Sequence, residues 1–117
     1  MFKGEIMSDM LISALRANGT LLANASSNVA NMNTRDYKSL RTTITEGQQG
    51  SVDVVTARNA TEGMPAEDGH QTSNVDLPRE FTDMILARRG FESVLAAIST
   101  REEMMDDLMK TFSSRHE

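Results

Sequence analysis

Apolar residues recur at intervals of four and three along the first third of the chain, which is the spacing of a narrow seam on one face of a helix. The pattern predicts a helix over residues 7–33. Gly19 lies inside it, where glycine costs about 1 kcal/mol against alanine, so we expect a bend or break there. The predicted seam of this helix consists of Leu11, Leu15, Leu22, Val29 and Met32.

The middle of the chain, residues 38–76, follows a different pattern. Residues 40–45 alternate in character with a period of two, which is typical of a half-buried strand. A second β-prone run begins at Val52, and the sequence Gly-Gln-Gln-Gly at residues 47–50 separates the two runs. Glycine and proline then punctuate residues 59–73, which indicates a loop. We therefore expect a small β-hairpin or extended arm that faces water.

The last third of the chain predicts one long helix over residues 77–112. Asp76 is a good N-cap, and Pro78 lies in the first turn, where a missing N–H group is harmless. Apolar residues again recur at intervals of four and three, over five heptads. The predicted seam of this helix consists of Leu77, Phe81, Met84, Phe91, Leu95, Ile98, Met105, Met109 and Phe112.

Helices of this length do not fit inside a compact domain of 12.9 kDa. At about 1.5 Å per residue, residues 77–112 span about 54 Å, whereas a domain of this size has a radius of gyration of about 13 Å. We expect a mainly α fold in which the two long helices pair antiparallel as a coiled coil. The expected parts are residues 1–37, 38–76 and 77–117. Such a pair leaves apolar stripes uncovered, which indicates a partner.

Composition excludes several classes of function. The net charge of −5 argues against a nucleic-acid partner that is bound through a basic surface, and against a polybasic membrane anchor. The chain has no cysteine and two histidines, so we expect no metal site. His70, Ser73 and Asp76 lack the nucleophile elbow of a hydrolase. We expect no catalytic residue, no cofactor and no small-molecule substrate.

Two polar clusters lie on the predicted helices. Asn24, Asn28 and Asn31 share one helical face, and amides can donate and accept hydrogen bonds without like-charge repulsion. We expect them to contact a neighbouring subunit, with a solvated face as the alternative. Glu102, Glu103, Asp106 and Asp107 contain like-charge pairs four residues apart, which mildly destabilise a helix. This acidic cluster indicates a solvated face or a contact with a basic partner.

Residues 26–38 read Ser-Ser-Asn-Val-Ala-Asn-Met-Asn-Thr-Arg-Asp-Tyr-Lys. They resemble the signature Ser-Asn-Asn-Ile-Ala-Asn-x-Asn-Thr-x-Gly-Tyr-Lys of bacterial flagellar rod and hook proteins. Asp36 stands where that signature has glycine, and aspartate can adopt the positive φ that the turn needs. The motif and the helical face that it continues contain Asn24, Asn28, Asn31, Asn33 and Tyr37.

The C-terminal part resembles the closing helix of the same family. The similarity begins at residues 73–77, Ser-Asn-Val-Asp-Leu, and continues through the run from Glu80 to Met104. Gly90 departs from the usual family sequence, and it weakens the helix while letting another backbone approach closely. The joint occurrence of both matches, at both ends and in the family's order, makes the resemblance specific.

The resemblance implies a structural subunit of the flagellar basal-body rod, most like the short proximal-rod proteins. It implies helical assembly into the torque-transmitting shaft around the export channel. The implied partners are copies of the chain, other rod and axial proteins, the motor base ring and the flagellar type III export apparatus. No cleavable leader is visible, and the resemblance implies export to a periplasmic rod by that apparatus. The alternative is a soluble helical adaptor or export chaperone that binds one helical client.

Overall fold

The N-terminal helix α1 runs from Phe2 to Ala30 in a computed structural model that describes residues 2–115, with side chains described from Ser8 onward. The outer limits of the expected parts, residues 1 and 117, lie outside the described residues. Helix α1 continues through Gly19 without a break, because packing on both sides of the helix outweighs the cost of one glycine. It ends three residues before the expected boundary.

A β-hairpin follows, as the alternating pattern predicts. Strand β1 (Leu40–Glu46) pairs antiparallel with strand β2 (Val52–Arg58), from Leu40 opposite Arg58 to Glu46 opposite Val52. The connection contains the short 3-10 turn η1 (Gln48–Gly50), in which Gln49 and Gly50 adopt φ values of 56° and 76°. The prediction of a hairpin that turns at residues 47–50 is confirmed.

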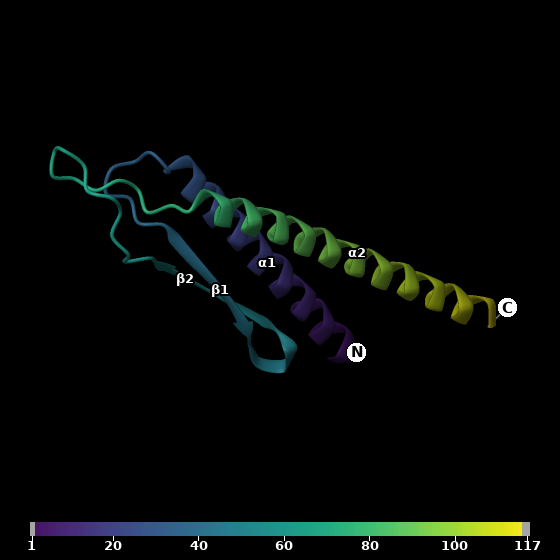
Figure 1. Cartoon of the computed structure of the whole chain (residues 1–117). Coiled ribbons are helices and arrows are strands. Elements are labelled where there is room, and N and C mark those ends of the chain that lie inside the picture. Colours follow the sequence, from purple (N-terminus) through teal and green to yellow (C-terminus); the bar gives the residue numbers. More distant parts are fainter. Residues whose placement is uncertain (1, 116–117) are drawn as a thin grey trace.

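Residues 59–76 form the expected loop, which extends past the end of the helix pair (Figure 1). Its tip folds back on itself through an isolated bridge between Pro65 and Gln71. The Thr72 N–H donates to the Met64 carbonyl at 2.8 Å, which closes this tip.

The C-terminal helix α2 runs from Leu77 to Arg115, three residues beyond the expected end. Asp76 caps it as predicted. The Asp76 carbonyl accepts the Glu80 N–H at 3.0 Å, and its side chain lies 3.4 Å from the Arg79 N.

Helix α1 lies between α2 and the hairpin, and the two helices run in opposite directions (Figure 1). The protein measures 81 × 24 × 14 Å and has a radius of gyration of 20.6 Å, well above the value of about 13 Å for a compact domain. This confirms an elongated, mainly α fold with a hairpin between two helices. Few side chains are buried: the apolar ones are Ala17, Ala25 and Ala87, and the polar ones are Asn28, Ser39 and Glu80.

Candidate assembly interface

The junction between α1 and the hairpin is organised by the side chain of Asn28, which is 1% exposed. Its Nδ2 donates to the Leu40 carbonyl at 2.9 Å. Its Oδ1 accepts the Leu40 N–H at 2.8 Å and the Tyr37 hydroxyl at 3.0 Å. One amide therefore fixes the start of β1 against α1, in the way that a neighbouring strand would.

Asn28 also joins the hairpin junction to α2. The carboxyl of Glu80, which is 5% exposed, lies beside the Asn28 amide. Burial raises the pKa of the Glu80 carboxyl above its ordinary value, and the hydrogen bond from Asn28 opposes that shift only in part. The Asn28 amide thus makes three hydrogen bonds within the chain and lies beside a buried carboxyl.

The other two asparagines of the same face also bond within the chain. Asn24 Nδ2 donates to the hydroxyls of Thr42 and Thr56, one on each strand, at 2.9 Å. Asn31 Nδ2 donates to the Ser27 carbonyl at 2.8 Å. The expectation that these three asparagines contact a neighbouring subunit is therefore wrong for Asn28, which is buried, and the donors of all three are engaged internally.

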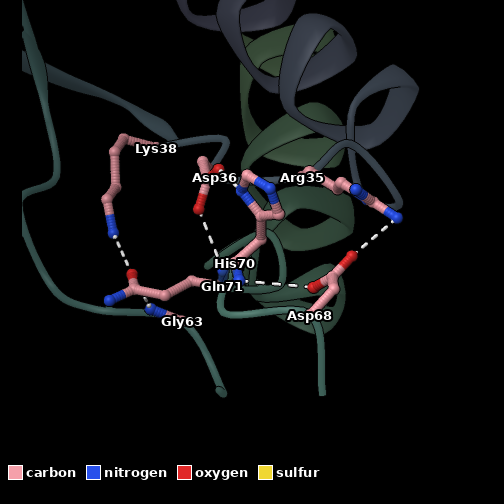
Figure 2. A network of polar contacts seen from close by, with 7 residues as sticks. All are labelled: Arg35, Asp36, Lys38, Gly63, Asp68, His70 and Gln71. Carbon is pink, nitrogen blue, oxygen red and sulfur yellow. Dashed lines mark hydrogen bonds and ion pairs between the residues drawn. The ribbon is translucent and has the colours of Figure 1, made fainter. Parts of the chain in front are cut away.

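The turn after α1 contains the residue that departs from the family signature. Asp36 adopts φ 55°, so the expectation of a left-handed residue at this position is confirmed. Its carboxyl also makes two contacts with the loop, which a glycine at this position could not make. Oδ1 accepts the Gln71 N–H at 2.9 Å, and Oδ2 lies 2.9 Å from His70 Nδ1 (Figure 2). The Gln71 N–H, followed by the His70 contact, holds the pKa of the Asp36 carboxyl below its ordinary value.

Neighbouring residues complete this tether between the turn and the loop. Lys38 Nζ donates to Gln71 Oε1 at 3.0 Å and to the Thr61 carbonyl at 3.1 Å. Arg35 pairs with Asp68 at 2.7 Å, and both side chains are largely exposed (Figure 2). The family motif thus forms the inner half of a polar junction that positions the loop. Of the remaining motif residues, Asn33 is exposed and Tyr37 carries the Arg58 guanidinium over its ring at 5.4 Å.

The face of α2 that packs on α1 agrees with the predicted seam at only every second position. At the positions between, the residue on the packing face precedes the predicted one by one. Glu80 and Ala87 are buried, and the same face continues through Phe91, Val94 and Ile98, which are half-buried. The predicted seam shares Met84, Phe91 and Ile98 with this face. Two further members, Phe81 and Leu95, are 49% and 45% exposed and lie beside the buried face, so their contact with α1 stays a prediction.

Close approach of the helices explains this choice of face. A Cβ atom on Gly90 would lie 2.5 Å from Asn18 Oδ1, so glycine makes room for an amide side chain of α1. The expectation that Gly90 admits a neighbour closely holds, but the neighbour is a side chain and not a backbone. Small residues at Gly90 and Ala87 bring the helices together, although larger apolar residues stand one position away.

Beyond Arg101 the packing face of α2 is exposed. All of residues 102–115 are exposed, and the four-three spacing of the packing face continues through Met105, Leu108 and Phe112. These three side chains are 50%, 48% and 53% exposed, and Met109 beside them is 63% exposed. We call Met105, Leu108, Met109 and Phe112 the distal seam.

The remaining predicted seam residues are divided between partial burial and exposure. Met32 is 44% exposed at the end of α1. The half-buried residues are Leu11, Leu15, Leu22, Val29, Leu77, Met84, Phe91 and Ile98.

Among the described residues, no group of three or more histidine, cysteine or acidic side chains is placed to hold a metal ion. In the same part of the chain, neither helix has an apolar stretch sufficient to cross a membrane.

A pair of long helices whose shared face continues uncovered is typical of proteins that complete their packing by assembly. The comparisons with known proteins match the C-terminal part of the chain. Residues 71–111 match the family model "Flagellar basal body rod FlgEFG protein C-terminal". The chain is 49% identical over 39 residues to "Flagellar basal-body rod protein FlgG" of Bacillus subtilis. The resemblance to flagellar basal-body rod proteins is therefore confirmed, and it is confirmed through the loop end and α2.

The matched segment covers 33% of this chain and 15% of the length of that relative. The family match includes most of the uncovered part of α2, so the distal seam lies on the helix that carries the family likeness.

Proposed function

We propose that this protein is a non-enzymatic subunit of the flagellar basal-body rod. It assembles helically through its N- and C-terminal helices, which pack as a coiled coil, and forms part of the torque-transmitting shaft around the export channel. Its partners are copies of itself and other rod and axial proteins, with the motor base ring and the type III export apparatus at the base of the rod.

The observation that carries this proposal is the distal seam. The same face of α2 packs on α1 up to Arg101 and then continues as Met105, Leu108, Met109 and Phe112, with no cover from the described part of the chain. An apolar side chain of this size gains about 1.5–3 kcal/mol when it is buried fully, so a second helix on this face would stabilise the contact strongly.

The small middle part supports a position in the proximal rod. A two-stranded hairpin and one loop are all that lies between the helices, which fits a short proximal-rod protein better than a hook protein with large outer domains. Export by the flagellar apparatus, without a cleaved leader, would place such a subunit in the periplasmic part of the basal body.

The test is complementation of a strain that lacks the gene. We expect the deletion strain to have no filaments, the wild-type gene to restore swimming, and a Met109→Ser/Phe112→Ser variant to fail. The matched control is Leu86→Ser/Met104→Ser, which removes two apolar residues that are 56% and 67% exposed on another side of α2. A deletion strain that swims normally, with no related gene in its place, would contradict the proposal.

Purified basal bodies distinguish the rod subunit from the adaptor or export chaperone. We expect the chain to be present in them and to cross-link to further copies of itself. A stable one-to-one complex with one helical client, together with absence from the basal body, would establish the adaptor and overturn the rod assignment.

A further inference from the structure

Methionine makes up half of the distal seam. Met105 and Met109 stand one helical turn apart on α2 and are 50% and 63% exposed. Of the four side chains in the seam, only these two thioethers react with mild oxidants, because Leu108 and Phe112 have no sulfur lone pair to donate. The surface that the proposed assembly would bury is therefore chemically reactive before it is buried.

Two methionines elsewhere in the chain are shielded by the fold. Met10 packs on the hairpin turn, where a Cβ atom added to Gly50 would lie 2.7 Å from Met10 Cε and 3.2 Å from Met10 Sδ. Met84 is half-buried on the face of α2 that packs on α1. Oxidation of a sulfur atom follows its exposure, so Met10 and Met84 should react slowly. The single chain thus leaves the distal seam open to a dissolved oxidant while it shields the methionines of its own packing.

We propose that Met105 and Met109 form a reversible oxidation site, at which a hydroperoxide converts both thioethers to sulfoxides and so prevents the unassembled chain from burying its distal seam. This inference rests on the proposed rod function, because it concerns the seam through which the subunit would assemble. It adds a chemical condition to that function, which is that only the reduced chain assembles.

The reaction transfers one oxygen atom from a hydroperoxide to each sulfur. A sulfur lone pair attacks the terminal peroxide oxygen, an S–O bond forms and the O–O bond breaks. The proton of the attacked oxygen moves to the leaving oxygen, which departs as water from hydrogen peroxide or as an alcohol from an organic hydroperoxide. Sulfur loses two electrons and the peroxide gains two. Methionine sulfoxide reductases reverse the change with two electrons from thiols and release the oxygen as water.

Oxidation changes the polarity of the seam at two adjacent places. Each sulfoxide oxygen is a hydrogen-bond acceptor on a side chain that was apolar. Because Met105 and Met109 are four residues apart on one helical face, both oxygens would enter the same contact. An apolar partner surface offers no donor to either oxygen, and an unsatisfied acceptor opposes burial. We expect oxidation of both residues to weaken the contact on the order of 10- to 100-fold.

Reactivity is tested on the purified full-length chain, treated with hydrogen peroxide and analysed by peptide mass spectrometry. We expect Met105 and Met109 to be oxidised several times faster than Met10 and Met84. A mixture of the two reductases that act on opposite sulfoxide epimers should restore them. If Met105 and Met109 react as slowly as Met84, the site is closed in the free chain and the proposal is overturned.

Complementation of the deletion strain tests the effect of a polar group at the site. Glutamine imitates the polarity of the sulfoxide, so Met105→Gln/Met109→Gln should lower the number of flagellated cells by about 10-fold or more. The matched control is Met64→Gln/Met104→Gln, which makes the same change at two methionines that are 74% and 67% exposed outside the distal seam. Equal numbers of flagellated cells with both variants would overturn the proposal.

Peroxide treatment of cells tests whether oxidation itself acts at this site. The strain lacks its methionine sulfoxide reductases, and each culture is compared with its own untreated culture while new flagella are built. The Met105→Leu/Met109→Leu variant cannot be oxidised at these positions, so it should lose a smaller fraction of its new flagella than the wild type. The control Met64→Leu/Met104→Leu should lose the same fraction as the wild type. Equal losses in the wild type and in Met105→Leu/Met109→Leu would show that the site does not control assembly.

The outcomes separate this inference from the rod function. A deletion strain that swims normally contradicts the rod assignment, whatever the reactivity of the two sulfur atoms. A chain that is required for swimming, but whose Met105 and Met109 are unreactive or can be oxidised without loss of flagella, overturns the oxidation site alone.

Discussion

The two ends of the protein reverse the usual distribution of polar and apolar groups. At the junction end, the polar side chains of Asn28 and Glu80 are buried and joined to each other. At the other end, Met109 and Phe112 are 63% and 53% exposed. The difference teaches that hydrogen bonds define the fold of the single chain, while the large apolar side chains are left for contacts outside it.

The largest expected effect comes from replacing Asn28 by leucine. The change removes the partner of the Leu40 N–H and carbonyl and of the Tyr37 hydroxyl, in bonds that are partly buried, and the neighbour of the buried Glu80 carboxyl. Each unsatisfied buried group costs about 1–3 kcal/mol, so we expect the free energy of unfolding to fall by about 3 kcal/mol or more.

Urea denaturation followed by circular dichroism measures the effect of Asn28→Leu. The control is Asn31→Ala, which removes a partly buried bond to the Ser27 carbonyl and an exposed bond from the Thr34 hydroxyl, and should cost less than about 1 kcal/mol. Equal losses in both variants would show that the junction does not depend on the buried amide.

A smaller effect is expected from Gly90→Leu. Since even a Cβ atom there would meet the Asn18 amide, the helices must separate, at a cost of about 1–3 kcal/mol. Thermal unfolding measures the change. Adding Asn18→Ala should recover part of the loss, and a double variant no more stable than Gly90→Leu alone would show that this contact is not what limits helix approach.

Glu80→Gln should stabilise the chain modestly, in a way that depends on pH. Because the folded-state pKa of Glu80 is raised, its contribution is fully present below the ordinary pKa and is lost as pH rises through the raised value. Glutamine can still accept the bond from Asn28. The stability gained over the wild type should therefore grow as the pH rises from the ordinary pKa of a glutamate through the raised value. Asp36 has the opposite pKa shift, but it is present in both chains and cancels.

The smallest effect on the single chain should come from Met109→Ser/Phe112→Ser. Exposed substitutions usually change stability by about 0.5 kcal/mol or less, so the unfolding curve of dilute protein should stay close to that of the wild type. A clear loss of stability would mean that the distal seam is already covered within the chain, and the contrast between the two ends would no longer hold.

Sequence reasoning succeeded where the signal was local. The alternation at residues 40–45 defined the first strand, Asp76 marked the start of α2, and the glycine-to-aspartate departure at Asp36 located the positive φ. Each of these features depends on a few neighbouring residues. The local backbone conformation determines which residue types are suitable there.

The packing face of α2 was missed because two seams one residue apart both show the four-three spacing. Hydropathy favours Phe81 and Leu95 over Glu80 and Ala87, yet the second pair is buried. Only the position of Asn28, with its partner in the hairpin 12 residues further along the chain, explains why a carboxyl stands on the buried face. The Asn28 side chain joins segments that are distant in the sequence. The periodicity of apolar residues along one helix cannot reveal such a contact.

The shortest dimension of the protein, 14 Å, is about the width of one helix with its side chains. Cooperativity must therefore spread along the protein and not across it, as in proteins built by stacking. Backbone amides near Arg115 should exchange hydrogen for deuterium much faster than those near the buried amide at the opposite end. Incorporation into a larger body would slow that exchange from the free tip inward.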